Sequence, residues 1–201
     1  MIAIIDYKAG NLASVANAFT RLGADFVVAS DKMELDRSDA VVFPGVGHAE
    51  SAMAALREKD LVDFLKTTEK PVLGICLGMQ LLYGSSEEGE TEALGIIPGR
   101  LKKFNPALGK VPHMGWNTIN IKTSHPVLHG IGPGSYFYHV HSYYAPVNEY
   151  TLASGEYINE FASIVAYKNF TGVQFHPEKS SSNGEKLLRN FLKEVPLKTQ
   201  L

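Results

Sequence analysis

Pro71-Val72-Leu73-Gly74-Ile75-Cys76-Leu77-Gly78-Met79-Gln80 places the only cysteine of the chain between an apolar run and a stretch that can form a helix. This pattern predicts a nucleophile elbow, a sharp turn from a strand into a helix that lifts one side chain out of a sheet. The residues two before and two after the nucleophile must be small, and Gly74 and Gly78 meet that requirement. A thiol at a helix N-terminus also feels the positive end of the helix dipole, which favours the thiolate. For Cys76 alone, a buried and inert structural cysteine stays open.

Strands and helices alternate on both sides of this stretch through the first half of the chain. The expected strands are 2–5, 26–29, 40–43 and 71–75, and the expected helices are 15–22, 56–65 and 187–192. This order is typical of βαβ units, so we expect an α/β fold with a central, mostly parallel (mixed) sheet flanked by helices. Short strands between 101 and 167 predict a smaller antiparallel region in the second half. Reactive groups should collect at the C-terminal ends of the parallel strands.

A histidine and a glutamate that could complete a nucleophilic site lie near the end of the chain. The segment 172–178 is expected to be a short strand that ends at a proline. Because side chains alternate along a strand, His176 and Glu178 should point the same way, with Val173 and Phe175 facing the core on the other side. Glu178 could then fix the tautomer of His176 and leave the other ring nitrogen for Cys76. A solvated turn is the alternative, but the order Cys, His, Glu favours a nucleophilic triad.

A glycine-rich turn is the candidate for part of an oxyanion hole, the set of backbone N–H groups that acyl transfer requires. The elbow supplies one N–H group, from Leu77, the residue after the nucleophile. The apolar run 40–43 leads into Pro44-Gly45-Val46-Gly47, where Gly45 or Val46 would present a second N–H group. An ordinary glycine-rich turn stays open as the alternative.

Length and composition limit the class of protein. With 201 residues, the chain is expected to form a single domain, 1–201, with a substantial core. The formal net charge of −2 and the lack of a basic stripe argue against a nucleic-acid partner. One cysteine excludes an intrachain disulfide framework and fits a reducing compartment. The N-terminal apolar run is too short for a signal peptide or a membrane span, so we expect a cytoplasmic location and no membrane partner.

Histidines raise the question of a metal centre. His139 and His141 share one face of an expected strand, as metal ligands can, but a third ligand at a convincing spacing is missing. We therefore expect no metal and no cofactor. The acidic segment 85–92 is expected to be a solvated loop. His48, just past the glycine-rich turn, is either a surface residue or a group on the substrate side, and the sequence leaves both open.

With these residues assembled, the chain resembles the triad-type (class I) glutamine amidotransferases. The segments that carry the resemblance are 44–47, 74–80 and 174–180. Further segments resemble, more narrowly, the glutaminase subunits of imidazole glycerol phosphate synthases, which act in histidine biosynthesis. These segments are 6–7, 10–12 with Ser14, 95–99, 111–117 and 138–144. The resemblance extends from near the first residue to beyond the triad, with no departure at a catalytic position.

The resemblance implies that L-glutamine is hydrolysed in two steps. Cys76 would attack the side-chain amide, and His176, paired with Glu178, would protonate the departing ammonia. The resulting thioester would then be hydrolysed to glutamate by a water that His176 activates. The residues that resemble the family's glutamine-binding elements are Gln80 and the backbone around His141, Ser142 and Tyr143.

The resemblance also implies a partner. Ammonia would pass to a separate (β/α)8-barrel cyclase subunit, which makes imidazole glycerol phosphate and an aminoimidazole carboxamide ribonucleotide, so a heterodimer is expected. Asn11, Trp116 and Asn117 would lie at the interface with the cyclase. By residue preference alone, Trp116 would be a packing residue instead.

Three other functions stay open. A free-standing γ-glutamyl hydrolase, or the glutaminase of a different synthase, would use the same chemistry. An inactive scaffold subunit would keep the fold alone, and the presence of Cys76, His176 and Glu178 counts against it.

Overall fold

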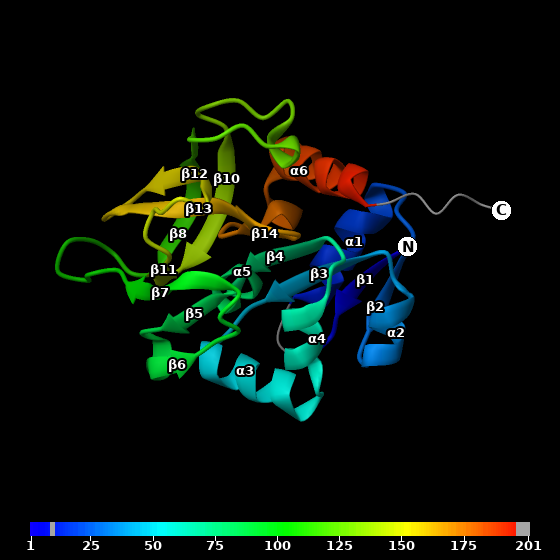
Figure 1. Cartoon of the computed structure of the whole chain (residues 1–201). Helices are drawn as coiled ribbons and strands as arrows, with labels where there is room; N and C mark the ends of the chain where they lie inside the picture. The colour runs from blue at the N-terminus through cyan, green and yellow to red at the C-terminus, as the bar shows by residue number, and fades with distance from the viewer. Residues whose placement is uncertain (9–10, 196–201) are drawn as a thin grey trace.

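The computed structural model describes residues 1–8 and 11–195, and an eight-stranded sheet forms its centre (Figure 1). In spatial order the strands are β2 (Phe26–Ala29), β1 (Ile2–Ile5), β3 (Ala40–Gly45), β4 (Val72–Cys76), β14 (Phe170–Val173), β13 (Glu160–Tyr167), β12 (Thr151–Glu156) and β9 (Asn120–Ile121). The strands from β2 to β14 pair in parallel, whereas the pairs from β14 to β9 are antiparallel. This mixed sheet confirms the predicted α/β fold.

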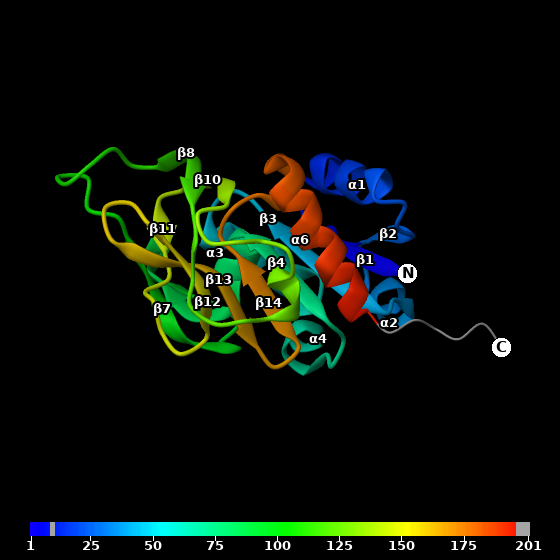
Figure 2. The same cartoon turned by 90° about the horizontal axis from the view of Figure 1, so that it is seen from above.

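Helices cover both faces of the sheet, as Figures 1 and 2 show. The helices are α1 (Leu12–Arg21), α2 (Lys32–Arg37), α3 (Ala49–Glu58), α4 (Leu61–Thr67), α5 (Leu77–Leu81) and α6 (Ser181–Glu194). Alternate side chains of β1 explain the two layers. Ile2 and Ile4 belong to the cluster that contains α1 and α6, whereas Ala3 and Ile5 belong to the cluster that contains α2, α3 and α4.

Two smaller sheets extend the molecule beyond the carboxyl ends of the parallel strands. One pairs β8 (His113–Thr118) with β10 (Tyr136–His141) in antiparallel fashion. The other has the order β11 (Tyr143–Tyr144), β7 (Ile97–Lys103), β5 (Tyr83–Ser86) and β6 (Thr91–Glu92). The smaller region is thus present, but it begins at Tyr83 rather than near residue 101, and it contains one parallel pair, β5 with β7.

Two local expectations were wrong. The helix expected over 56–65 is two helices, α3 and α4, because Asp60 between them adopts a left-handed φ of 54°. The acidic segment 85–92 is also more ordered than a solvated loop. It contains the end of β5, a short 3-10 helix (Glu88–Glu90) and β6.

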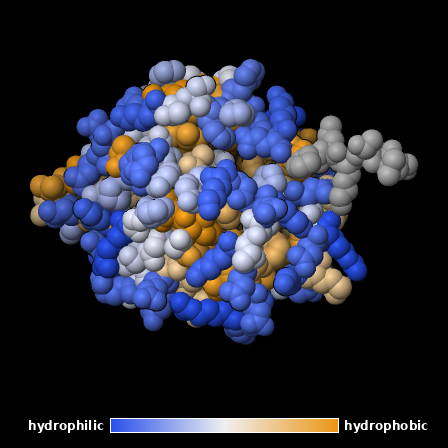
Figure 3. Space-filling model, viewed as in Figure 1, coloured by the Kyte–Doolittle hydropathy of each residue, from blue (hydrophilic) through white to orange (hydrophobic). Residues whose placement is uncertain are grey.

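The face of the molecule seen in Figure 3 is mostly hydrophilic with small hydrophobic patches. One patch lies at the tip of the loop between β7 and β8, where Leu108 is 69% exposed. Within residues 1–8 and 11–195, none of the helices combines the length and the apolar character needed to cross a lipid bilayer.

Candidate active site

Cys76 occupies a strained turn between β4 and α5. Its φ of 52° and ψ of −108° lie where residues with a side chain are rarely found. The two flanking glycines have no room for a side chain: a Cβ on Gly74 would lie 2.9 Å from the backbone nitrogen of Met79, and one on Gly78 would overlap the carbonyl oxygen of Phe43. This is the backbone geometry of an elbow. Because α5 has only five residues, its dipole stabilises the Cys76 thiolate less than a longer helix would.

His176 and Glu178 form a buried pair. The distance from His176 Nδ1 to Glu178 Oε1 is 2.9 Å, and the side chains are only 5% and 1% exposed. The expected extended strand from 172 to 178 was wrong in part. β14 ends at Val173, and Glu178 reaches the imidazole from a 3-10 turn, Pro177–Lys179. A solvated turn is also wrong, because the pair is shielded from water.

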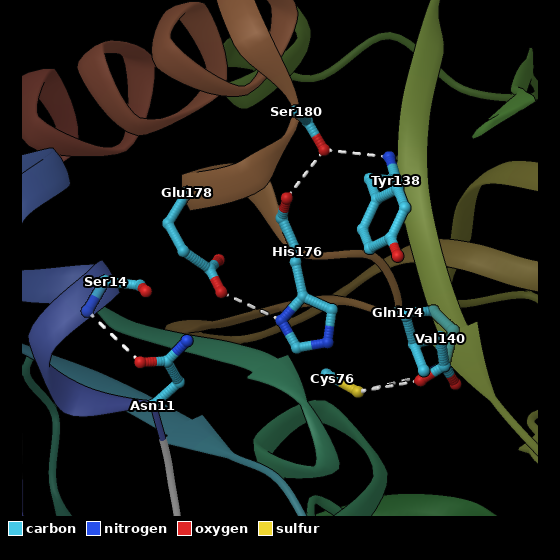
Figure 4. A network of polar contacts seen from close by, with 9 residues as sticks. All are labelled: Asn11, Ser14, Cys76, Tyr138, Val140, Gln174, His176, Glu178 and Ser180. Atoms are coloured by element: carbon cyan, nitrogen blue, oxygen red, sulfur yellow. Dashed lines mark hydrogen bonds and ion pairs between the residues drawn. The ribbon is translucent and has the colours of Figure 1, made fainter. Parts of the chain in front are cut away.

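The backbone of His176 is fixed by the neighbouring strand β10 (Figure 4). Its N–H group donates to the carbonyl oxygen of Tyr138 at 2.9 Å. The Ser180 hydroxyl donates to the carbonyl oxygen of His176 at 2.6 Å and accepts the N–H group of Tyr138 at 2.9 Å. Sequence reasoning did not single out Ser180, because its partner Tyr138 lies 42 residues away.

The surroundings of His176 favour its charged form. Burial alone would lower its pKa, but hydrogen bonds and charge interactions with Cys76 and Glu178 outweigh burial and raise the pKa to about 10. Glu178 bonds Nδ1, which leaves the other ring nitrogen for the sulfur of Cys76. An imidazolium between a carboxylate and a sulfur can protonate a departing amine.

Cys76 opens into a cleft of about 330 Å³, a volume at the lower end of small-molecule sites. The sequence-predicted residues that line the cleft are Val46, Cys76, Leu77, Gln80, His141, Ser142, Tyr143 and His176. Gly47, of the glycine-rich turn expected near the substrate, also lines the cleft, and so do Glu88, Pro112, Val140 and Lys179, for which the sequence alone indicated no role. Glu88 also accepts the backbone N–H of Ala49 at 2.8 Å, which ties the acidic segment to the start of α3.

The two loops proposed for the oxyanion hole lie side by side. Gly45, at the end of β3, is opposite Cys76 in the β3–β4 register, and Val46 is 39% exposed and lines the cleft. Gly45 is tightly packed: a Cβ there would lie 2.6 Å from the hydroxyl oxygen of Tyr7. That hydroxyl donates to the carbonyl oxygen of Pro44 at 2.9 Å. Burial, with a smaller effect of Cys76, raises the pKa of Tyr7, so the phenol stays neutral.

The side chain of Gln80 points into the protein from the floor of the cleft. Its Nε2 donates to the carbonyl oxygen of Tyr143 and to Oε1 of Gln174, both at 3.0 Å. Nε2 of Gln174 lies 3.9 Å from Cys76 Sγ, and that sulfur is 3.7 Å from the carbonyl oxygen of Val140. The amide nitrogen of Gln80 is therefore used inside the protein, and Gln174 is a neighbour of the sulfur that the sequence did not reveal.

Three buried imidazoles lie beside the cleft. In the part of the chain that the structure describes, His113, His139 and His141 form a group whose candidate ligand atoms lie within 4.8 Å of one another. No third ligand was expected from the sequence spacing, but the pairing of β8 with β10 brings His113 beside His139 and His141. Nδ1 of His113 lies 3.2 Å from Nε2 of His141. A metal ion would have to displace the proton that these two nitrogens share.

The expected interface residues lie at different depths. Trp116 on β8 is 52% exposed and makes an edge contact with Tyr138, so it is not a core residue. Asn117 points to the other face and donates to the carbonyl oxygen of Glu156 at 2.9 Å. Asn11 caps α1 by accepting the N–H group of Ser14 at 3.3 Å. Gly10, in the same expected segment, lies outside the described residues.

His48 is a helix cap. Its Nδ1 accepts the backbone N–H of Glu50 at 3.3 Å at the start of α3, and its side chain does not line the cleft. Of the two roles that the sequence left open, this geometry favours the surface residue.

Comparison with known proteins gives consistent matches over nearly the whole chain. The family described as Glutamine amidotransferase class-I matches residues 3–195. An imidazole glycerol phosphate synthase subunit HisH of Bacteroides fragilis is 48% identical over 95% of this chain and 98% of that protein. Subunit HisH 1 of Vibrio vulnificus is 46% identical over 95% and 97%.

Solved structures share the fold at low sequence identity. A structure described as a glutamine amidotransferase has a TM-score of 0.74 and 18% identity, covering 98% of this chain and 100% of that one. The structure of PurLQS from Thermotoga maritima gives a TM-score of 0.73 at 15% identity, with coverage of 97% and 98%.

Proposed function

The chain belongs to the class-I glutamine amidotransferase family and, within it, to the HisH subunits of imidazole glycerol phosphate synthase, and we propose that it hydrolyses L-glutamine with Cys76, His176 and Glu178 as its catalytic triad. The observation that carries this assignment is the strained elbow at Cys76 beside a buried imidazole whose charged form is stabilised. Strained backbone at a functional residue is retained when the chemistry needs it.

The first step forms a thioester. The Cys76 thiolate attacks the amide carbon of the glutamine side chain, and the carbonyl electrons move to oxygen. Backbone N–H groups of Leu77 and of Gly45 or Val46 stabilise that oxyanion. When the carbonyl re-forms, the C–N bond breaks, and His176 gives its proton to the leaving nitrogen, which departs as ammonia. Glu178 keeps the imidazole oriented throughout.

The second step restores the enzyme. His176, now neutral, takes a proton from water as the water oxygen attacks the thioester carbon. Collapse of the second oxyanion breaks the C–S bond and releases glutamate and the Cys76 thiolate. The net reaction is glutamine plus water giving glutamate plus ammonia. Glutamine is held in the cleft between Gln80 and the segment of His141, Ser142 and Tyr143.

The proposed glutaminase acts together with a second subunit. We propose that ammonia passes to a (β/α)8-barrel cyclase subunit that makes imidazole glycerol phosphate and aminoimidazole carboxamide ribonucleotide. We also propose that residues 1–201 act as one amidotransferase domain in the cytoplasm. The exposed side of β8 and β10 supports docking there. It carries Met114, Trp116 and Tyr136 at 62%, 52% and 57% exposure, and Val140, opposite Met114, lines the cleft.

Covalent labelling tests the chemistry. An electrophilic glutamine analogue should add its mass to the peptide that contains Cys76, and excess L-glutamine should prevent the addition. Cys76→Ser should not be labelled, whereas His48→Gln, outside the cleft, should be labelled like the unmodified chain. Labelling that glutamine does not prevent, or that occurs at another residue, would contradict the proposed nucleophile.

A further inference from the structure

The sheet of β8 and β10 has two different faces. Cross-strand pairing places Met114 opposite Val140 and Trp116 opposite Tyr138 on one side. The alternate residues lie on the other side, where His113, His139 and His141 are 4%, 0% and 5% exposed. The imidazoles pack against aromatic rings, including those of Tyr157, Phe161 and Phe175. Polar rings buried in this way need hydrogen-bond partners.

Two of the three imidazoles have partners that fix their protons. The Asn117 amide is oriented by the backbone, because its Nδ2 donates to the carbonyl oxygen of Glu156 at 2.9 Å and its Oδ1 accepts the N–H of Thr118 at 2.8 Å. Nδ2 lies 3.3 Å from Nε2 of His113, which must therefore accept. The proton of a neutral His113 is then on Nδ1, 3.2 Å from Nε2 of His141.

The contact of His141 with Tyr143 gives the same direction of hydrogen bonding. Nδ1 of His141 lies 2.8 Å from the carbonyl oxygen of Tyr143, which can only accept a hydrogen bond. His141 therefore carries its proton on Nδ1 and presents a lone pair on Nε2 to His113. The donors run in one direction, from Asn117 through His113 and His141 to the Tyr143 carbonyl.

This chain of hydrogen bonds ends at Tyr143, which lines the cleft. The same carbonyl oxygen of Tyr143 accepts Nε2 of Gln80, whose amide also bonds Gln174, and Gln174 in turn lies beside the sulfur of Cys76. These contacts connect Asn117 on β8 with Cys76 through the side chain of His141 on β10, the backbone carbonyl of Tyr143 on β11, and the side chains of Gln80 and Gln174.

We propose that His113 and His141 are positioning residues of the glutaminase site: their one-directional hydrogen bonds hold the Tyr143 carbonyl, and through it Gln80 and the glutamine-binding wall, at a fixed distance from β8. This inference rests on the proposed glutaminase function. Neither imidazole lies between the nucleophile and its acid, so the pair acts on substrate position and not on proton transfer.

The pair is suited to this role because it stays neutral. Burial lowers the pKa of His113 to about 4, and burial, partly offset by the bond to Tyr143, lowers that of His141 to about 3. The rings that face them are His139, whose pKa burial also lowers, and the aromatic rings of Phe104, Tyr157 and Phe161. His176 is a further titratable neighbour, and its charge lowers the pKa of His141. The direction of the hydrogen bonds is therefore maintained at neutral pH.

Matched substitutions in the same cluster test the role. His113→Phe removes the donor to His141 but keeps a buried aromatic ring. His139→Phe makes the same chemical change in a neighbouring ring that has no hydrogen-bond partner on either nitrogen. His113→Asn keeps an amide donor near the position of Nδ1. Each variant is measured as the full chain in complex with its cyclase, for the KM and kcat of glutamate release and for melting temperature.

The proposal predicts a split between binding and turnover. His113→Phe should raise KM for glutamine by about tenfold with kcat changed by less than about threefold, because a ground-state contact is lost. His113→Asn should recover most of the loss, and His139→Phe should leave KM unchanged. Equal KM values in His113→Phe and the unmodified chain, or an equal rise in His139→Phe, would overturn it. No glutamate release by the unmodified complex would instead contradict the proposed function.

Ring tautomers give a readout that does not depend on activity. Long-range ¹H–¹⁵N NMR spectra of the ¹⁵N-labelled chain should place the proton of both His113 and His141 on Nδ1. A proton on Nε2 of either ring would contradict the proposed direction of the hydrogen bonds, even if His113→Phe failed to fold.

Discussion

At the scale of single residues, the position of Cys76 combines strain with a charged neighbour. Its left-handed φ of 52° is held by close packing of Gly74 and Gly78, so the sulfur is presented by the backbone and not by a flexible loop. His176, the proposed acid and base, comes from the segment that follows a different strand, β14. Nucleophile and base are thus placed independently and meet only in the folded chain.

Replacing the sulfur of Cys76 should abolish glutamine turnover and leave the fold intact. Cys76→Ala is expected to reduce glutamate release by at least about 10³-fold, because no other side chain can form the thioester. Melting temperature should change little, since the substitution removes one partly shielded atom at the cleft. Glutamine turnover and thermal unfolding of the two proteins measure both effects. Turnover within tenfold of the unmodified chain would exclude Cys76 as the nucleophile.

The carboxylate of Glu178 should control the charge on His176. Glu178→Gln removes a partner that raises the pKa of His176, so that pKa should fall below its value of about 10. Because the folded-state pKa lies above 6.5, the charged imidazole stabilises the fold below pH 6.5, and this contribution is lost as pH rises towards 10. The variant should therefore lose less stability over that interval. Unfolding at several pH values, with NMR titration of His176, measures this, and identical profiles would contradict it.

At the scale of secondary-structure elements, the turn from β4 into α5 depends on two glycines that touch backbone. Gly78→Ala should destabilise the fold by about 2–4 kcal/mol, because its Cβ would overlap the carbonyl group of Phe43 in β3, which cannot move freely. Gly132→Ala is the matched control, since nothing lies within 4 Å of its Cβ position. Urea unfolding compares the two, and equal free energies of unfolding would show that the elbow tolerates a side chain.

Local patterns in the sequence were sufficient for the elements near Cys76, because the strands are continuous apolar runs. They failed where the cause is not local. Asp60 breaks the expected helix by adopting a left-handed conformation without a glycine or proline to mark it. Glu178 reaches His176 through a 3-10 turn that proline begins, and the strand pattern could not show this.

For the candidate site too, local sequence patterns were sufficient only within single segments. The residues of the expected triad, and those residues of the cleft that belong to a compact motif, were visible in the sequence. The pairing of His113 with His141, the anchor at Ser180 and the contact of Gln174 with Gln80 join segments that are 28, 42 and 94 residues apart. Such contacts follow from the register of β8 with β10 and from the meeting of strand ends, which a single sequence does not specify.

At the scale of the whole molecule, the cleft lies next to the exposed face of β8 and β10. An exposed aromatic cluster beside a site is typical of a docking surface. We expect Trp116→Ala to weaken binding to the cognate cyclase by about 10- to 100-fold without changing melting temperature. Met33→Ala, which removes a side chain that is 59% exposed on α2, is the control and should bind normally. Affinity measured by titration calorimetry decides this, and unchanged affinity in Trp116→Ala would place the interface elsewhere.

The most direct measurement is glutamate release from L-glutamine by the full chain, alone and with its cognate barrel cyclase and the nucleotide ligand of the cyclase. We expect a low rate alone and a large rise in the ligand-bound complex, with Cys76→Ala inactive in both states. A full rate alone that the cyclase does not change would indicate a free-standing amidohydrolase. No glutamate release in either state would contradict the assignment of a glutaminase.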